Sequence, residues 1–268
     1  MESCLEKMEK KFWENKKSLH FFDAHCWIGR SNNLLPVSLS TPDQILEQMD
    51  HCGIEKALVS HTLSRYYHPL VGNEHLLQEI VGIDRLQSCF VLLPPYTREM
   101  NSLDQYIENM LTKGIRAVRL FPRLHHFSLD EWSSGSLLEK FEERRIPLFI
   151  WGREIEWNTL YTICKRYPRL PVVLEQTNEE AYWNGRYLFP LLEKRENLFL
   201  EVANCVLYLE IDEIVKRFGA ERLIFGSYLP VDDPNASLML ITEGDFSPEE
   251  KEQIAHKNLE KLIEGVVV

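Results

Sequence analysis

The sequence predicts an α/β protein, a single (β/α)₈ barrel preceded by a short N-terminal helical extension. Its 268 residues suit one large domain, because barrels of this class run to about 250 residues. Eight short apolar runs alternate with helical patterns, and several runs are apolar throughout, as parallel strands covered on both faces are. Eight units joined by crossover connections close into a barrel more readily than they extend an open sheet.

The extension is predicted to cover residues 1–20, and the barrel domain residues 21–268. Leu5, Met8 and Phe12 are spaced to share one face of a helix, and lysines surround them. We expect this helix to pack on the outside of the barrel or across its bottom.

The eight predicted strands are short and rich in apolar residues. They cover residues 21–27, 56–61, 87–93, 115–121, 147–151, 171–176, 198–204 and 222–228. Helices fill the gaps: Ser40 or Thr41 caps one that Gly53 ends, and Ser247 forms a capping box with Glu250 at the start of the last. The loop after the fourth strand is the longest, and functional residues of barrels lie at this end of the strands.

The composition excludes several functional classes. The net charge of −11 argues against a nucleic-acid or anionic-membrane partner. No apolar run reaches the roughly 18 residues that span a bilayer, and the charged first residues do not resemble a secretory signal. The six cysteines show no metal-binding spacing, so we expect reduced thiols and a cytoplasmic protein. A homo-oligomer is compatible with this composition.

Several stretches together resemble the amidohydrolase-related family of TIM-barrel hydrolases. They follow one another in the family's order from Phe21 to Ile263, and they are FFDAHCWIG, GNEHLLQEIVGIDRLQSCFVLLP, GIRAVRLFPRLHHFSLD, PLFIWG, YPRLPVVLEQ, RLIFGSYLP and IAHKNLEKLI. The resemblance implies a hydrolytic site at the strand ends. In the metal-dependent members, histidines of strands one, five and six bind a divalent metal, and an aspartate after strand eight activates the attacking water. The bound cation lowers the pKa of that water toward neutrality and polarises the scissile carbonyl.

Most of the implied metal-ligand positions hold other residue types in this chain. His25 matches the first histidine of strand one. The remaining positions fall on Trp27, Trp151, Gln176 (or Glu175, if the register shifts by one) and Tyr228. An indole offers no lone pair to a metal, because its nitrogen is only a donor. We therefore expect no cofactor, and zinc or another divalent metal only if an unexpected ligand set around His25 replaces the usual one.

His25 and Glu175 are the candidate catalytic residues. Alternation along the first strand places Asp23, His25 and Trp27 on one face, toward the barrel interior. A buried carboxylate such as Glu175 has a raised pKa that suits a general base. The alternatives are a buried, hydrogen-bonded histidine and an ion pair between Glu175 and a strand-end arginine.

Arg119 and Arg153 are the candidate substrate-binding cations, because guanidinium groups at a barrel mouth suit a carboxylate or phosphate. The alternative for both is an ion pair with Glu175, Glu201 or Asp232.

Four further positions are candidate substrate-binding residues at the strand ends: Trp27, Trp151, Gln176 and Tyr228. The two indoles form either a stacking floor for a ligand or a hydrophobic plug in a vacated cavity.

The predicted function is hydrolysis of a small, carboxylate-bearing lactone, amide or ester without the family's usual metal centre. The resemblance includes a precedent, since some lactone-hydrolysing members work without metal. The alternative is a non-catalytic barrel that binds a small anionic ligand or serves as a partner subunit, which is what the loss of metal ligands in a former enzyme produces.

Overall fold

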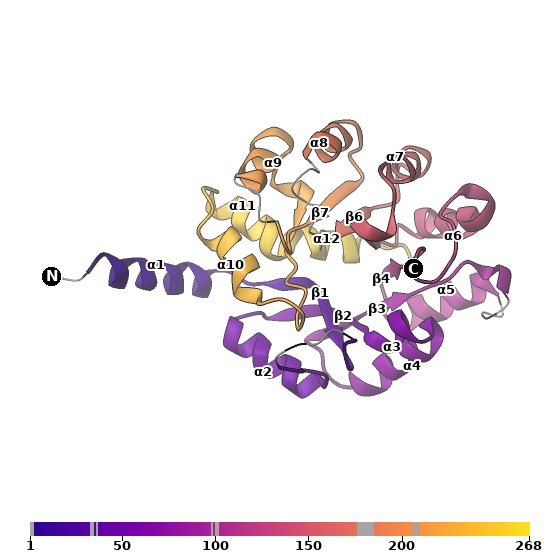
Figure 1. The fold of residues 1–268 in the computed structure, drawn as a ribbon, viewed down its shortest axis with the longest axis horizontal. Helices are drawn as coiled ribbons and strands as arrows, with labels where there is room; N and C mark the ends of the chain where they lie inside the picture. The colour runs from indigo at the N-terminus through magenta and orange to yellow at the C-terminus, as the bar shows by residue number, and fades with distance from the viewer. Residues whose placement is uncertain are drawn as a thin grey trace.

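The strands form one parallel sheet whose order follows the chain. The structure is a computed structural model that describes residues 3–32, 35, 37–97, 99, 102–175, 185–205 and 209–268. Within these residues eight strands pair in the order β1 to β8 around a common axis (Figure 1). They are β1 (Phe22–Ile28), β2 (Lys56–His61), β3 (Leu86–Val91), β4 (Ala117–Leu120), β5 (Leu148–Trp151), β6 (Val172–Glu175), β7 (Leu198–Glu201) and β8 (Leu223–Ile224). This confirms the predicted (β/α)₈ TIM barrel.

The barrel closes through the chain that follows β8. The predicted strand 222–228 pairs regularly only as far as Ile224. Beyond it, the amide of Ala24 donates to the carbonyl of Phe225 at 3.0 Å, and the amide of Trp27 donates to that of Leu229 at 2.8 Å. The first strand therefore has hydrogen-bonded neighbours on both sides, which fixes its carboxyl end in the barrel wall.

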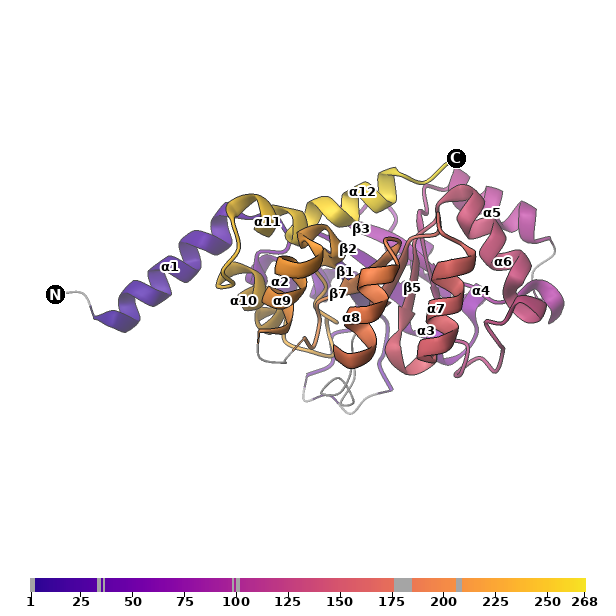
Figure 2. The same ribbon diagram turned by 90° about the horizontal axis from the view of Figure 1, so that it is seen from above.

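Helices surround the sheet, as the alternating pattern predicts (Figures 1 and 2). The predicted caps are present: Thr41 caps α2, Gly53 ends it in the left-handed conformation, and Ser247 forms a capping box with Glu250. The helices are α1 (Cys4–Ser18), α2 (Pro42–Cys52), α3 (Thr62–Tyr66), α4 (Pro69–Glu79), α5 (Leu103–Thr112), α6 (Glu131–Arg144), α7 (Trp157–Arg166), α8 (Gly185–Lys194), α9 (Glu210–Phe218), α10 (Pro234–Thr242), α11 (Pro248–Glu252) and α12 (Asn258–Glu264). Shorter turns lie at Pro95–Thr97, Gly152–Glu154 and Ala220–Arg222, and a π-helical turn lies at Gln253–Lys257.

The N-terminal helix α1 projects away from the barrel (Figures 1 and 2). A capping box between Ser3 and Glu6 begins it, and it contacts the body at α10. Leu5, near its start, is exposed. The expectation that this helix packs along the outside or across the bottom of the barrel is therefore wrong for most of its length.

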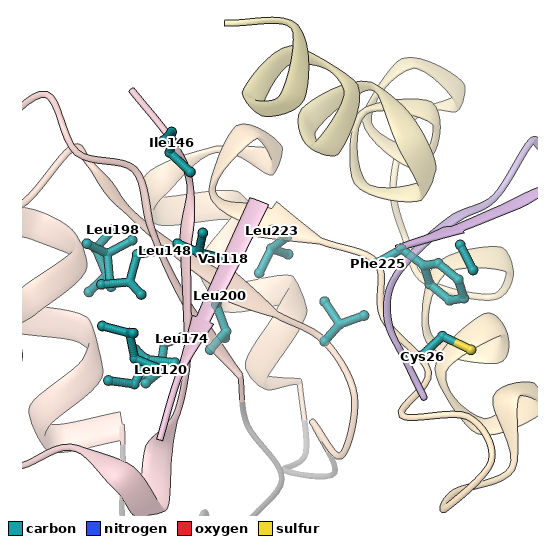
Figure 3. Close-up of a cluster of buried hydrophobic side chains, with 14 of the residues drawn as sticks. Cys26, Val118, Leu120, Ile146, Leu148, Leu174, Leu198, Leu200, Leu223 and Phe225 are labelled. Atoms are coloured by element: carbon teal, nitrogen blue, oxygen red, sulfur yellow. The ribbon is translucent and has the colours of Figure 1, made fainter. Parts of the chain in front are cut away.

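Alternation along the strands divides the core into layers. Side chains that point outward meet the helices, among them Val118, Leu120, Leu148, Leu174 and Leu200 (Figure 3). The inward layer contains Phe22, Ala24, Leu58, Cys89, Ala117, Phe149, Val173 and Ile224. A further cluster at the mouth contains Trp27, Val91, Phe121, Ala203 and Tyr228. In β4 this alternation turns Arg119 toward the interior, one pleat nearer the mouth than Ala117.

All six cysteines are free thiols. No helix in the described part of the chain is long and apolar enough to cross a membrane.

Candidate functional site

Polar side chains gather inside the barrel at the carboxyl ends of the strands. They come from six strands or the segments just after them and are Asp23, His25, Ser60, Arg119, Glu175, Glu201 and Ser227. All are buried, so each charge there needs a partner. The carboxyl ends of the strands are where barrels carry functional residues.

Arg119 is fully buried, and its guanidinium bonds only to groups of the protein. Its Nε donates to Oε1 of Glu175 at 2.8 Å, and Nη1 donates to the hydroxyl of Ser60 at 2.7 Å. Nη2 donates to the carbonyl of Ala24 at 2.5 Å. The expectation that Arg119 points into an open ligand pocket is therefore not met, and the alternative of an ion pair with Glu175 describes its position.

His25 lies between the two buried glutamates of β6 and β7. Its Nδ1 is 3.4 Å from Oε2 of Glu201 and 3.8 Å from Oε1 of Glu175. Its ring packs on that of Tyr228 with 4.5 Å between ring centres. Burial lowers the pKa of His25 well below its ordinary value, and the charges of Arg119 and Arg65 lower it further, so the imidazole is neutral at pH 7.

Burial also sets the protonation of the carboxyl groups. It raises the pKa of Glu201 well above its ordinary value, and the neighbouring charge of Glu175 adds to this. Burial raises the pKa of Glu175 as well, but the guanidinium of Arg119 opposes the shift. Of the two carboxyl groups, Glu201 is therefore the one more readily protonated, while Glu175 pairs with Arg119.

Asp23 ties the first strand to the segment after β8. Its Oδ1 accepts from the amides of His25 and Ser227, each at 2.9 Å, and its Oδ2 accepts from the hydroxyl of Ser227. Burial raises its pKa to about 6 against these hydrogen bonds, so it is ionised at pH 7. The pairing of β1 with β2 shifts register between Asp23 and Cys26, so simple alternation from Asp23 to Trp27 does not hold.

Gly226 leaves the space that the carboxyl group of Glu201 occupies. A Cβ at this position would lie 2.0 Å from Oε1 of Glu201. The Phe-Gly-Ser run after β8 therefore has two structural roles. Gly226 leaves room for the carboxyl group of Glu201, and Ser227 donates hydrogen bonds to Asp23.

Arg65, at the end of α3, occupies the mouth above this cluster and is 7% exposed. Its Cζ lies 4.4 Å from the ring centre of Trp151, 5.1 Å from that of Phe121 and 5.6 Å from that of Trp27. Its Nη1 donates to the hydroxyl of Tyr228 at 3.3 Å, and its Nε has no acceptor among the described residues. Arg65 was not among the site residues predicted from the sequence. The available signal was its place just after the second predicted strand, where side chains reach the functional face.

The mouth has little free space among the described residues. The cavity there, lined among others by Trp27, Thr62, Tyr66 and Tyr228, has a volume of about 10 Å³, which is about what one water molecule needs. Of the two expectations for the tryptophans, a stacking floor for a ligand thus has no open space above it among the described residues. Trp27 is buried against Phe121 and acts as a plug.

The remaining predicted residues lie at the edge of the mouth or outside the described residues. Trp151 is half-buried, and Arg153 is exposed with its Cζ 5.8 Å from the ring centre of Trp151. Gln176 lies outside the described residues. Glu175, its neighbour in the alternative register, is the residue that reaches the buried cluster.

The residues at the mouth do not fit the metal centre that the resemblance implies. The Nε1 atom of Trp27 is buried without an acceptor, and an indole has no lone pair for a cation. In the residues with described positions, no group of three or more His, Cys, Asp or Glu side chains is arranged to hold a metal ion.

Comparisons with solved structures show the same fold in several proteins. An uncharacterised TIM-barrel protein from Bordetella bronchiseptica is 17% identical, with a TM-score of 0.70 over 92% of this chain and 99% of that one. A dihydroxybenzoic acid decarboxylase from Polaromonas sp. JS666, with bound manganese and 2-nitroresorcinol, is 13% identical, with a TM-score of 0.71 over 92% and 97%. A probable 2-pyrone-4,6-dicarboxylic acid hydrolase from Acinetobacter baumannii, with citric acid bound, is 16% identical, with a TM-score of 0.63 over 92% and 100%.

The sequence itself places the chain in a family. No curated protein matches it. The amidohydrolase family model matches residues 23–264, nearly the whole barrel domain. The chain therefore belongs to the amidohydrolase family.

Proposed function

We propose that this chain is a non-catalytic member of the amidohydrolase family that acts by binding a small molecule. One observation carries the proposal. Among the described residues, Arg65 fills the mouth of the barrel together with the rings of Trp27, Trp151 and Tyr228, and the cavity beside them has a volume of about 10 Å³. A substrate cannot reach His25 unless these side chains move.

The charges beneath the mouth support the same proposal. The two guanidinium groups of Arg119 and Arg65 are matched by two carboxylates, Glu175 and Asp23, when Glu201 holds its proton. An ion added to a buried cluster whose charges already balance would be an uncompensated buried charge, which is costly. The predicted anionic ligand at Arg119 therefore has no charge to neutralise.

A metal analysis together with an activity screen tests the proposal. Purified protein is expected to contain well under one equivalent of zinc or manganese per chain. It is expected to leave 2,6-dihydroxybenzoate and 2-pyrone-4,6-dicarboxylate unchanged, with and without added Mn²⁺. The proposal would be overturned if the wild type turns over either compound and this activity is lost in His25→Asn but kept in Arg144→Met.

Metal-free hydrolysis of a lactone, amide or ester is the second candidate, and the pair of His25 and Glu201 favours it. In such a reaction the neutral imidazole of His25 accepts a proton from the attacking water. Glu201 lies 3.4 Å away, and burial raises its pKa, which favours the protonated form; in this reaction it supplies the proton to the leaving oxygen or nitrogen. Glu201, acting as an acid, is the catalytic carboxyl group here in place of Glu175, which was predicted as a general base but is bound to Arg119.

The two candidate functions predict different turnover when the mouth is opened by a substitution at Arg65. If the barrel is a hydrolase, replacing Arg65 with alanine gives substrate a wider path, and any slow turnover of a carboxylate-bearing lactone increases. If the barrel is non-catalytic, Arg65→Ala gives no turnover at all. The double variant Arg65→Ala/His25→Asn is the control for activity that does not use the buried cluster.

A further inference from the structure

The end of the barrel opposite the mouth has a hollow of about 210 Å³, at the point where β1 and β2 begin. His20, which precedes β1, and His256 both line it. Their ring centres lie 6.1 Å apart, and the ring planes are nearly perpendicular, at 87°. The side chain of His20 is 75% exposed, and that of His256 is 16% exposed. Two neighbouring imidazoles are therefore accessible to solvent in one hollow.

Each of these imidazoles has a glutamate at its Nδ1 atom. Nδ1 of His20 is 2.6 Å from Oε2 of Glu55, and Nδ1 of His256 is 2.8 Å from Oε2 of Glu260. A carboxylate can only accept, so in the neutral ring the proton lies on Nδ1 and the lone pair lies on Nε2. Metal-binding histidines usually have this arrangement, because a carboxylate at one ring nitrogen fixes the tautomer and makes the other nitrogen a better ligand.

The two Nε2 atoms are close enough to share one ion. Neither has a hydrogen-bond partner among the residues that the structure describes. Zinc binds an imidazole nitrogen at about 2.0–2.1 Å, which places the ion about 3 Å from the ring centre. Two rings whose centres lie 6.1 Å apart can therefore hold one ion between them once the exposed ring of His20 turns its Nε2 toward that of His256.

Carboxylates around the two rings favour a cation, and the imidazoles select its class. Glu55 and Glu260 line the hollow, and Glu252 interacts electrostatically with both rings. Lys56 also lines the hollow, so binding must depend on the imidazole nitrogens rather than on charge alone. Imidazole suits zinc, nickel and copper, whereas magnesium and calcium prefer oxygen ligands.

A π-helical turn positions His256. This turn covers Gln253–Lys257 and lies between α11 and α12. Such turns inside α-helices are frequent at functional sites. Glu260 follows His256 by four residues, in the first turn of α12, which brings its carboxylate to the ring. His20 comes from the other end of the chain, so the pair joins the segment after α1 to the last helices.

We propose that His20 and His256 bind one zinc ion through their Nε2 atoms, with water completing its coordination. The site goes beyond the proposed function, since it lies at the barrel end opposite the mouth and uses none of the residues there. Two protein ligands are fewer than a structural zinc site uses, so a chelator removes the ion and the purified chain keeps little of it. The bound ion links the segment between α1 and β1 to the helices at the end of the chain.

Calorimetric titration of the chelator-treated full chain with zinc chloride tests the proposal. We expect the wild type to bind one zinc ion per chain. His20→Asn and His256→Asn are each expected to weaken binding by at least about tenfold, because even the loss of a group that only supports a metal ligand costs that much. The matched control is His126→Asn, which should bind zinc as the wild type does. His126 is also exposed but lies in the loop after β4, and asparagine tolerates its φ of 56°.

Thermal unfolding and a substitution at Glu260 give two further readouts. Zinc should raise the Tm of the wild type and of His126→Asn, because an ion that binds the folded chain stabilises it. It should leave the Tm of His20→Asn unchanged, and the exposure of His20 means that this variant still folds. Glu260→Gln keeps the shape of the side chain but removes the carboxylate at Nδ1 of His256, and it is expected to weaken zinc binding by about tenfold.

Four results would overturn the inference. The first is a wild type that does not bind zinc, and the second is equal zinc binding by the wild type and His20→Asn. The third is Mg²⁺ binding as tight as zinc binding, which would mean that the carboxylates hold the ion. The fourth is half an equivalent of zinc per chain with a doubled mass in light scattering, which would mean that the ion joins two copies. None of these variants touches the mouth, so the activity screen of the proposed function stays an independent test.

Discussion

The guanidinium carbon of Arg65 lies 4.4 Å from the ring centre of Trp151, and the same guanidinium donates to the hydroxyl of Tyr228 at 3.3 Å. Trp151 and Tyr228 occupy positions that the sequence resemblance assigns to a metal-binding histidine and to the water-activating aspartate. A cation held over an aromatic ring in a desolvated site is stabilised by about 2 kcal/mol. The mouth of this barrel thus has a fixed positive charge supplied by the chain itself.

Replacing Arg65 with methionine tests whether this charge stabilises the mouth. Methionine fills part of the volume but removes the cation–ring contacts, so we expect the free energy of unfolding to fall by about 1–2 kcal/mol. The positive charge of Arg65 helps to lower the pKa of His25, so that pKa should rise in the variant. Urea denaturation and an NMR titration of His25 measure the two effects. An unchanged His25 titration would show that Arg65 does not act on the buried cluster.

Arg119→Met tests whether the buried ion pair is structural. The change leaves Glu175 buried without its guanidinium, and loss of one partner of a buried pair costs about 3–5 kcal/mol of unfolding free energy. Arg119→Met/Glu175→Gln should recover part of this loss, because no uncompensated charge remains. Arg123→Met is the matched control, since its ion pair with Glu156 is exposed and contributes at most about 1 kcal/mol. If Arg119→Met is as stable as the wild type, the ion pair does not stabilise the fold, and the original prediction that Arg119 binds a ligand would be favoured.

The fold could be predicted from the sequence because parallel strands and their helices leave periodic patterns. The weakest element was β8, where the apolar run to Tyr228 predicted a longer strand than Leu223–Ile224. The chain leaves the regular ladder there because Ser227 bonds to Asp23 and Tyr228 adopts a φ of 58°. Such a bend depends on a partner some 200 residues earlier in the chain, which local patterns do not contain.

The candidate site could be predicted only as a set of residues near one face. The sequence placed His25, Arg119 and Glu175 at the strand ends, and the structure brings them together. Which arginine faces the mouth depends on side-chain direction and pairing. Arg119 lies on a pleat that turns it toward Glu175, whereas Arg65 reaches the centre from a short helix. That Arg65 rather than Arg119 lies at the mouth is therefore a tertiary effect.

Gly226→Ala tests the close approach of Glu201 to the segment after β8. The new methyl group would lie 2.0 Å from Oε1 of Glu201, so the carboxyl group must shift from its present position beside His25. We expect a loss of about 1–3 kcal/mol in unfolding free energy, which is typical of overpacking in a core. Gly185→Ala is the control, because an added Cβ there meets no atom of the described residues within 4 Å and alanine favours helix α8. Equal stability of the two variants would contradict the packing described for Glu201.

Glu210→Gln tests a buried carboxyl group at the start of α9. Neither oxygen of Glu210 has a partner among the described residues, and burial raises its pKa to about 7. The ordinary value of 4.5 applies to the unfolded chain, so between pH 4.5 and 7 the folded state binds more protons than the unfolded state. The contribution of Glu210 to stability therefore falls as the pH rises through this window.

The glutamine variant removes this titration while keeping the shape of the side chain. At pH 8 we expect Glu210→Gln to be more stable than the wild type by on the order of 2 kcal/mol, since one pKa unit corresponds to about 1.4 kcal/mol and partial solvent access reduces the total. At pH 4 the two proteins should differ little, because Glu210 is protonated in the folded state and the unfolded chain keeps most of its protons. Chemical denaturation at both pH values measures the difference. Glu213→Gln is the control, because Glu213 is exposed on the same helix, and it should change the free energy of unfolding by the same small amount at each pH. If Glu210→Gln behaves in the same way, the carboxyl group of Glu210 is solvated.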